Sequence, residues 1–374
     1  MSPNELRLGV IGFGGFAQFA VQQFVQVPGV RLVAMAGTHR EAAVAAAKRF
    51  GIPDIEEVDA LLARPDVDLV YIATPPFLHY PQGLAALQAG KHVICEKPLA
   101  MTLAQAEELV ALAHQRNLLC IANLMQRYNP LFPQVRALIN ERLLGDFLHG
   151  FFENYAADEG LGPDHWFWNR PVSGGIFIEH AVHFFDLFAG WLGPGEVVAA
   201  QAALRPGVAS ASQVEDQVHA TVRYTGGNLV NFYHGFTQPG RLDRQELRLV
   251  FERGDVTLHG WIPLQYRIHA LADESQTRRL CELFPDGRLD VTEAYGPPQR
   301  GCRGRFKPID AYQLFELHGG DSQPKLHRYG DLVRAMLADQ MAWLADRTHQ
   351  RRITEANGRD SVALAERADQ LAHA

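Results

Sequence analysis

Short apolar runs alternate with helical patterns over the first 125 residues or so of the chain. The predicted strands are Leu6–Ile11, Val30–Ala36, Leu69–Ala73, His92–Cys95 and Leu118–Ala122. Helical patterns separate them, from the first glycine turn to about Val27 and over Glu41–Phe50, Pro81–Ala89 and Leu103–Arg116. Strands that are apolar on both faces and alternate with helices are typical of a parallel sheet covered on both sides. This part of the chain is therefore predicted to be an α/β domain with a doubly wound parallel sheet.

The rhythm changes after this point, because strand patterns now follow one another in pairs. The predicted strands are Asp146–Tyr155, Val197–Leu204, Asp216–Tyr224, Leu229–Phe236, Glu246–Phe251 and Val256–His259. Gly226-Gly227 and Gly254-Asp255 are hairpin turn signals, which indicates a large, open, mostly antiparallel sheet. Residues 272–325 are rich in charge, proline and glycine and are expected to be irregular. Helices are predicted from about Tyr329 to Arg347 and from about Arg359 to the last residue.

A chain of 374 residues exceeds the size at which one hydrophobic core stops growing, so two domains are expected. The change of pattern places them at residues 1–125, the α/β domain with the parallel sheet, and 126–374, a second α/β domain with the mostly antiparallel sheet. With 21% charged residues and a net charge of -7, the chain has no general attraction for nucleic acid or an anionic membrane surface. The expected partner is a small molecule.

The cysteines give no sign of a disulfide framework or a metal site. Cys95, Cys120, Cys281 and Cys302 form no C-x-x-C pair and have no metal-ligand spacing. Reduced thiols fit a cytoplasmic protein. We expect neither a signal peptide nor a membrane span, because the first residues lack a basic segment followed by an apolar stretch and no long apolar run is free of charges and glycines.

A glycine-rich turn follows the first predicted strand. Gly12-Phe13-Gly14-Gly15-Phe16-Ala17 is a G-x-G-x-x-A pattern between a strand and a helix. Gly12 permits the tight turn, Gly14 lets the backbone approach a pyrophosphate, and Ala17 lets the helix pack closely on the strand. The helix that follows would present free N–H groups to the phosphates. The pattern and its position predict dinucleotide binding, against the alternative of a glycine turn with no ligand.

The end of the second strand bears on which dinucleotide is bound. An NAD site usually has an Asp or Glu there, whereas this chain has Gly37-Thr38-His39-Arg40. Thr38 offers a hydroxyl group, His39 lies beside it, and the Arg40 guanidinium could pair with a 2′-phosphate. The alternative is that Arg40 is a solvated residue opening the next helix. The sequence favours NADP over NAD.

Glu96-Lys97-Pro98 directly follows the strand His92–Cys95. A lysine at the carboxyl end of a parallel strand faces the region where ligands bind in this architecture. A partly desolvated ammonium group could hydrogen-bond a substrate oxygen and exchange a proton with it. The alternative is an ordinary surface Lys-Pro loop.

A second candidate segment begins after Gly174-Gly175. If Ile176–Asp186 is helical, then Glu179, His183 and Asp186 are spaced i, i+4 and i+7 and share one face among apolar neighbours. Ionisable groups in such surroundings need a partner, a ligand or water. Three interpretations are possible: a proton-transfer site, a satisfied polar cluster between domains with Asp186 orienting His183, and a metal site that includes His180. The last is disfavoured because no further ligand has recognisable spacing, so no metal is predicted.

Taken together and in this order, the motifs resemble the Gfo/Idh/MocA oxidoreductase family, of the glucose–fructose oxidoreductase and inositol dehydrogenase type. The resemblance covers nearly the whole chain and is carried by Gly12–Ala17, Thr74–His79, Glu96–Pro98 and Gly174–Asp186. It implies a Rossmann domain followed by an α/β domain whose open antiparallel sheet often serves oligomerisation. A homodimer or homotetramer is therefore expected.

Site roles follow from the same resemblance. It implies that Lys97 is the catalytic lysine and His183 the acid/base histidine, with Glu179 also catalytic. Thr74, Pro75 and His79 would line the nicotinamide side of the site, and Glu96 would support the cofactor. Two departures stand out, because Glu179 replaces the family's usual Asp and Ala181 its usual Gly. Residues 272–325 have no clear counterpart.

Further residues are candidates for substrate binding. Arg127 follows the last Rossmann strand, and it would either bind substrate or hold the domains together. Trp168, Asn169 and Arg170 could stack on a sugar ring and bond its hydroxyls, although interdomain packing explains the tryptophan equally well. Tyr155 and His180 complete the candidate set.

These expectations combine into one function and two rivals. The leading hypothesis is hydride transfer between nicotinamide C4 and a secondary alcohol or ketone of a sugar-like or cyclic polyol substrate. The resemblance also leaves open an NAD-dependent glycosidase that acts by transient oxidation. The third hypothesis is a non-catalytic sensor that keeps the Rossmann fold.

Overall fold

The computed structural model describes residues 5–37, 40–52, 55–157, 161–162, 164–204, 214–304 and 307–374, with only the backbone of residues 40, 42 and 43. A six-stranded parallel sheet forms the first part of the described chain, in the order β3-β2-β1-β4-β5-β6. Its strands are β1 Leu6–Ile11, β2 Val30–Ala36, β3 Ile55–Glu56, β4 Leu69–Ile72, β5 His92–Cys95 and β6 Cys120–Ala122. Its helices are α1 Gly15–Phe24, α2 Arg40–Phe50, α3 Val58–Ala63, α4 His79–Gln88 and α5 Leu103–Arg116.

This first sheet confirms the predicted Rossmann domain. All four residues of β4 are buried, as expected for a strand covered on both faces. The order reverses between β1 and β4, so the carboxyl ends of these strands form the switch point where ligands bind in such sheets. The glycine turn follows β1 and Lys97 follows β5, so both lie at this edge.

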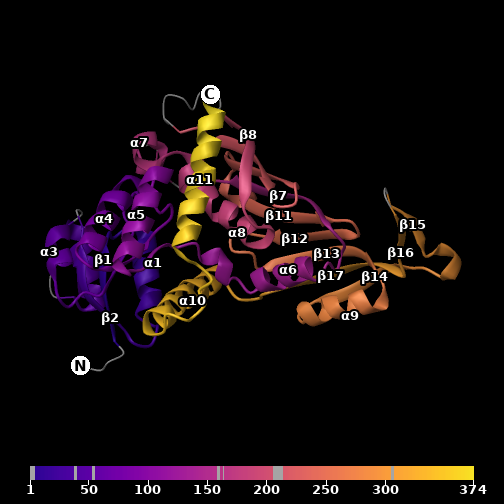
Figure 1. Ribbon diagram of the computed structural model, residues 1–374, viewed down its shortest axis with the longest axis horizontal. Coiled ribbons are helices and arrows are strands. Elements are labelled where there is room, and N and C mark those ends of the chain that lie inside the picture. Colours follow the sequence, from indigo (N-terminus) through magenta and orange to yellow (C-terminus); the bar gives the residue numbers. More distant parts are fainter. Residues whose placement is uncertain are drawn as a thin grey trace.

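Within the described residues, the second sheet has nine strands in the order β14-β17-β13-β12-β11-β7-β10-β9-β8, at the right in Figure 1. Only the β7–β10 pair is parallel, so the predicted large, mostly antiparallel sheet is confirmed. The strands are β7 Phe147–Ala156, β8 Gly195–Ala203, β9 Gln217–Tyr224, β10 Leu229–Phe236, β11 Arg244–Phe251, β12 Gly254–His259, β13 Gln265–Ala272, β14 Arg288–Ala294 and β17 Gln313–Gly320.

Helices cover one face of this sheet. They are α6 Leu131–Asn140, α8 Val182–Leu192 and α9 Glu274–Leu283, with the short α7 Arg170–Ser173 nearby. Phe184 of α8 stacks on Phe152 of β7 with ring centroids 3.5 Å apart, and Phe185 meets Phe232 of β10 at 4.9 Å. Burial alternates along β7, so its other residues face away from these helices.

Residues 272–325 are not the irregular excursion that their composition suggested. They contain α9, β14, β17 and a small hairpin of β15 Gly301–Arg303 and β16 Pro308–Asp310. A capping box between Asp273 and Gln276 begins α9, and Phe315 of β17 is fully buried. A smaller error concerns Gly254-Asp255, which opens β12, because the chain turns two residues earlier, at Glu252-Arg253. The Gly226-Gly227 turn is confirmed.

The last two helices, α10 Lys325–Ala345 and α11 Glu355–Ala372, return to the first sheet. Leu332, Met336 and Leu337 of α10 are buried in the first hydrophobic core, while Leu364 and Ala368 of α11 belong to the second. Figure 1 shows α11 in yellow between the two sheets. The first hydrophobic core is therefore completed by α10, which lies far beyond the predicted domain boundary at residue 125. No helix of the described chain is long and apolar enough to cross a membrane.

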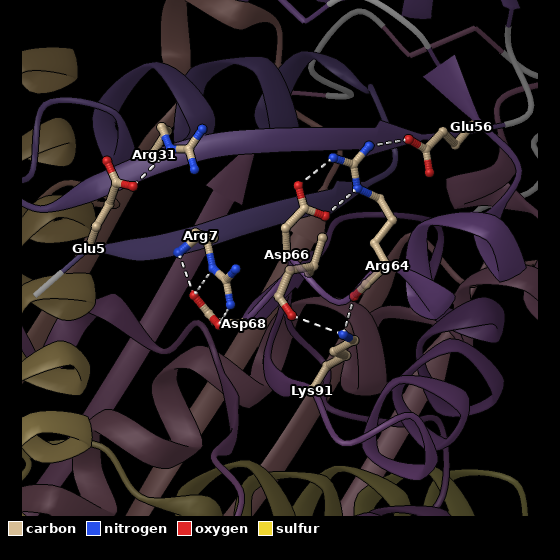
Figure 2. A network of polar contacts seen from close by, with 9 residues as sticks. Glu5, Arg7, Arg31, Glu56, Arg64, Asp66, Asp68 and Lys91 are labelled. Atoms are coloured by element: carbon tan, nitrogen blue, oxygen red, sulfur yellow. Dashed lines mark hydrogen bonds and ion pairs between the residues drawn. The ribbon is translucent and has the colours of Figure 1, made fainter. Parts of the chain in front are cut away.

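Ion pairs join the amino ends of the strands in the first sheet (Figure 2). Arg7 of β1 makes two side-chain bonds to Asp68, at 2.8 and 2.6 Å. The Arg7 hydrogen bonds hold the pKa of the Asp68 carboxyl below its usual value. Lys91, just before β5, donates to the carbonyl oxygens of Arg64 and Val67 at 2.5 and 2.9 Å. These contacts tie neighbouring strands together within one sheet.

Candidate active site

The glycine turn after β1 has the geometry of a phosphate-binding loop. Gly12 has a φ of +103°, and a Cβ there would lie 2.5 Å from the carbonyl oxygen of Ala73, so only glycine fits without strain. A Cβ on Gly14 or Gly15 would meet nothing within 4 Å, so the space above the loop is open. Helix α1 starts at Gly15 with no side-chain cap and no acidic residue in its first turn. Its free N–H groups therefore suit a pyrophosphate.

The structure describes some of the other predicted cofactor residues and leaves others undescribed. Ala17 is buried, as expected for close packing of α1 on the sheet. The Phe16 ring packs on Tyr329 of α10 at 5.5 Å, so only its backbone remains for the phosphates. Thr38, His39 and the side chain of Arg40 lie outside the described residues. The preference for NADP therefore stays a prediction.

His79 joins the loop after β4, which carries Thr74, to the loop after β5, which carries Lys97. Its Nε2 lies 2.7 Å from the carbonyl oxygen of Thr74, next to Pro75, and its Nδ1 lies 2.6 Å from that of Pro98. The ring is 1% exposed, and burial lowers its pKa to about 4 although both carbonyl contacts favour the protonated form. A neutral ring donates to one of the two carbonyls. His79 thus fixes the Thr74 and Lys97 loops relative to each other.

Glu96 is held within the first sheet. The Tyr71 hydroxyl and the Asn123 amide both donate to its Oε1, the latter at 2.8 Å. Burial raises the pKa of the Glu96 carboxyl. The side chain thereby anchors the loop that carries Lys97.

Lys97 meets the second domain through Glu179. Its Nζ donates to the carbonyl oxygen of Glu179 at 2.8 Å and forms an ion pair with Glu179 Oε1. The two side chains are only 17% and 10% exposed. The structure thus joins two of the predicted catalytic residues across a sequence separation of 82 residues.

His183 lies one helical turn beyond Glu179. The segment begins as a π-helix, η4 Phe177–Ala181, and continues as α8. Nδ1 of His183 is enclosed and has no hydrogen-bond partner among the described residues. Burial, and to a smaller extent the Lys97 charge, hold the pKa of His183 well below its usual value. An enclosed, neutral imidazole therefore stands beside the Lys97–Glu179 pair.

Asp186 does not orient His183. Its carboxylate accepts from Arg127 Nε at 2.7 Å and Nη2 at 2.8 Å, and from Asn357 Nδ2 at 3.0 Å. Burial nevertheless raises the pKa of Asp186. The guanidinium of Arg127 is thus committed to joining η2 Met125–Tyr128 to α8. Of the two roles considered for Arg127, this contact favours holding the domains together.

Three other candidates are not brought to Lys97. Tyr155 lies on the sheet face away from α8, where its ring meets Tyr233 at 5.2 Å and Arg244 at 4.7 Å. Arg170 pairs with Glu215 and Asp369. Asn169 is exposed at the start of α7. The bonds and ring contacts of these side chains thus lie within the second domain, and their role in substrate binding stays a prediction.

Trp168 stands closer to the site. Its indole N–H donates to the carbonyl oxygen of Leu161 at 3.4 Å. Its ring meets that of Phe236, which also contacts His180 at 5.0 Å. The Phe236 ring thus lies between Trp168 and His180, and Trp168 is part of the aromatic packing around His180.

Two residues of the site were missed from the sequence. Trp261, in the turn between β12 and β13, places its ring 4.4 Å from that of His180 and 5.3 Å from that of His183. His234 of β10 places Nδ1 2.8 Å from Nδ1 of His180. The only available signals were a tryptophan after Gly260 and a polar residue at a core position of β10. In the part of the chain that the structure describes, no group of three or more His, Cys, Asp or Glu could hold a metal ion.

Comparison with known proteins decides the family. Residues 6–124 match the model of the Gfo/Idh/MocA oxidoreductase family with an NAD-binding Rossmann fold, and residues 132–257 match the Gfo/Idh/MocA C-terminal domain. The chain belongs to this family. The resemblance seen in the motifs is thereby confirmed. This Gfo/Idh/MocA protein is an oxidoreductase with an NAD-binding domain.

Individual relatives differ in what their names say they act on. The 1,5-anhydro-D-fructose reductase of Ensifer adhaerens is 34% identical over 237 residues, which cover 62% of this chain and 69% of that protein. A glycosyl hydrolase family 109 protein of Streptomyces niveus is 32% identical over 195 residues, covering 47% of this chain and 40% of that protein. Among solved structures, levoglucosan dehydrogenase in complex with NADH and levoglucosan has a TM-score of 0.78 at 20% identity, covering 99% of this chain and 97% of that chain. The last similarity shows the fold alone.

Proposed function

We propose that this oxidoreductase transfers a hydride between nicotinamide C4 and a secondary alcohol or ketone of a sugar-like or cyclic polyol substrate. The observation that carries the proposal is the buried Lys97–Glu179 ion pair beside His183 at the carboxyl edge of the Rossmann sheet. The name of the 1,5-anhydro-D-fructose reductase relative supports a substrate of this class.

The chain has the features needed to hold the dinucleotide. The open space above Gly14 and Gly15 and the uncapped start of α1 fit its pyrophosphate. The absence of a carboxylate after β2 supports NADP as the preferred form. When bound, the nicotinamide supplies the hydride in one direction and accepts it in the other.

The residues around Lys97 supply the proton that the substrate oxygen gains and stabilise the negative charge on that oxygen. In the reductive direction the substrate oxygen gains one proton as its carbon gains the hydride. Buried N–H groups without an acceptor are rarer than acceptors without a donor, so the enclosed Nδ1 of His183 carries the lone pair and Nε2 the proton. Lys97 Nζ is then the proton donor at the site, and neutral His183 donates a hydrogen bond from Nε2 to the substrate oxygen, because loss of that proton would leave an imidazolate anion. The Lys97 ammonium also stabilises negative charge on the substrate oxygen, and Glu179 orients it.

A substrate panel tests the proposal. The purified protein is incubated with NADPH or NADH and a set of keto sugars that includes 1,5-anhydro-D-fructose, and with NADP⁺ or NAD⁺ and sugars or cyclic polyols. We expect turnover, read as a change in nicotinamide absorbance, with NADPH preferred over NADH. Nucleotide binding without turnover over the whole panel would contradict the proposal and favour a sensor.

The glycosidase is the second candidate, since the glycosyl hydrolase family 109 relative supports it. Transient oxidation leaves the nicotinamide unchanged after each cycle, so the same machinery would serve. Release of a chromophore from an aryl glycoside, with no net change in nicotinamide absorbance, identifies this activity. Steady net oxidation of NADPH by a keto sugar excludes it as the main function.

We further propose that the protein forms a homodimer or homotetramer through the open face of the nine-stranded sheet. This face carries the half-buried rings of Phe151, Tyr155 and Tyr233, with Arg248 lying 5.0 Å from Phe151. Aromatic and arginine side chains are enriched at protein interfaces. Light scattering of Tyr155→Asp against the wild type tests it, because a charge on this face should lower the measured mass. An unchanged mass would refute this interface.

A further inference from the structure

His180 and His234 form a buried pair behind the Lys97–Glu179 contact. His180 follows Glu179 on η4 and is 6% exposed, while His234 is fully buried in β10. The two Nδ1 atoms lie 2.8 Å apart, and the ring planes are nearly perpendicular. Apolar rings surround His234, with Phe152 at 5.0 Å and Phe184 at 6.2 Å. Neither residue has a role in the proton transfer described above.

The proton count within the pair fixes the tautomers. At this separation one proton lies between the two Nδ1 atoms, so one ring donates and the other accepts. Burial keeps both rings neutral by lowering their pKa values, that of His234 to about 3. If His180 donated, His234 would carry its proton on Nε2, which is enclosed and has no partner among the described residues. If His234 donates, that Nε2 holds only a lone pair, which is the less costly arrangement.

The accepting ring, His180, then carries its own proton on Nε2. Within the described residues no hydrogen bond uses this nitrogen, while Nδ1 is taken by His234. His180 shares the Trp261 ring with His183, so it borders the same site as His183. A free N–H at this place is suited to an oxygen acceptor. A sugar or cyclic polyol has such an oxygen on the carbon next to the reacting one.

We propose that His180 donates its Nε2–H to a substrate oxygen adjacent to the reacting carbonyl, and that His234 is a positioning residue that holds His180 in this tautomer. This inference rests on the proposed function for its substrate class. It makes the vicinal oxygen a determinant of specificity, because a site built to hydrogen-bond an oxygen discriminates against an analogue that lacks it.

Two substitutions of His234 test the positioning role. His234→Asn keeps a short side chain with an N–H donor, whereas His234→Phe keeps the ring shape and removes the donor. With 1,5-anhydro-D-fructose and NADPH, we expect His234→Phe to raise KM roughly 10-fold, as for loss of one hydrogen bond, with kcat changed by less than about 3-fold. His234→Asn should restore KM to within about 3-fold of the wild type. Equal KM values for the Phe variant and the wild type would overturn the proposal, and so would equal losses in both variants.

A deoxy analogue of the substrate gives a matched control. For an analogue of 1,5-anhydro-D-fructose that lacks the hydroxyl next to the carbonyl, the wild type and His234→Phe should have the same KM, because the oxygen that His180 would bond is gone. A difference that persists with this analogue would reveal a general loss of structure instead.

A spectroscopic measurement keeps the inference testable without turnover. Long-range ¹H–¹⁵N spectra of the histidine-labelled wild type should show His180 protonated on Nε2 and His234 on Nδ1. The reverse assignment would overturn the positioning role even if the enzyme reduces keto sugars. Conversely, the expected tautomers with no turnover in the panel would sink the proposed function and leave the tautomer assignment standing.

Discussion

Strand β5 has a lysine near each end, and the two lysines have different partners. Lys91, just before the strand, donates to two backbone carbonyl groups of its own domain (Figure 2). Lys97, just after it, pairs with Glu179 of the other domain. An ammonium satisfied by nearby carbonyls has a structural role. One held by a carboxylate from another domain, beside an enclosed histidine, can be shared with a substrate.

The amino and carboxyl edges of the first sheet differ in the same way, in whether their polar groups have partners. At the amino edge, Arg7 and Asp68 are paired and part-exposed, with side chains 22% and 31% accessible. At the carboxyl edge and its interface with the second domain, Asn123 Oδ1, Gln126 Oε1 and His183 Nδ1 are buried with no partner among the described residues. Enclosed polar atoms without partners cost stability, so these three atoms distinguish the carboxyl edge from the paired amino edge.

The largest effect on stability is expected at the interface of the two domains. Arg127→Met leaves the Asp186 carboxylate, only 2% exposed, without its cation. We expect the free energy of unfolding in urea to fall by on the order of 3 kcal/mol, as for a broken buried ion pair. Arg127→Lys is the matched control, because it keeps the charge and loses only the paired geometry, so its loss should be clearly smaller. A loss below about 1 kcal/mol in the Met variant would show that this pair does not join the domains.

A smaller effect is expected from acid. Burial lowers the pKa of His79 to about 4 and that of His234 to about 3, below the usual 6.5 of an unfolded histidine. The unfolded chain therefore binds protons first, and stability falls as pH drops below about 6.5. Each such histidine should account for about 1.4 kcal/mol at pH ~5.5.

His234→Asn separates this contribution from the rest. Unfolding free energies measured at pH ~7 and ~5.5 should differ by roughly 1 kcal/mol less in the variant than in the wild type. An identical pH dependence in both proteins would show that His234 takes up its proton in the folded state.

The smallest effect is expected at the amino edge. Arg7→Met removes a part-exposed pair, so the free energy of unfolding should fall by clearly less than in Arg127→Met, with unchanged kcat. The Asp68 carboxyl, whose pKa Arg7 lowers, loses this stabilisation only as pH falls below the ordinary range of an aspartate. A loss as large as that of Arg127→Met would remove the distinction between the two edges.

Local patterns predicted the elements that position the site. The glycine turn after β1 and the lysine after β5 lie where the strand patterns placed them, because buried parallel strands have a strong apolar signature. Strand β14 was not predicted, for the opposite reason, because nearly all of its residues are exposed. Its alternation of polar and apolar residues is limited to Arg288–Thr292, and the apolar side chains of Leu289 and Val291 are themselves exposed.

Contacts between distant segments could not be read in this way. Nothing near Lys97 in the sequence indicates Glu179, and nothing near His180 indicates His234 or Trp261. The π-helical turn also left no mark in the spacing of Glu179 and His183, because its hydrogen bonds depend on packing around it. Arg127 and Asp186 were both singled out, but their contact with each other required the fold.

Paired substitutions at the two ends of β5 test the central claim most directly. Lys97→Met should lower kcat with 1,5-anhydro-D-fructose and NADPH by at least ~100-fold while NADPH affinity stays within about 3-fold. Lys91→Met should leave kcat within about 2-fold and instead lower the free energy of unfolding by about 2 kcal/mol, because two carbonyl groups lose a charged donor. Turnover in the Lys97 variant equal to that of the Lys91 variant would contradict the account.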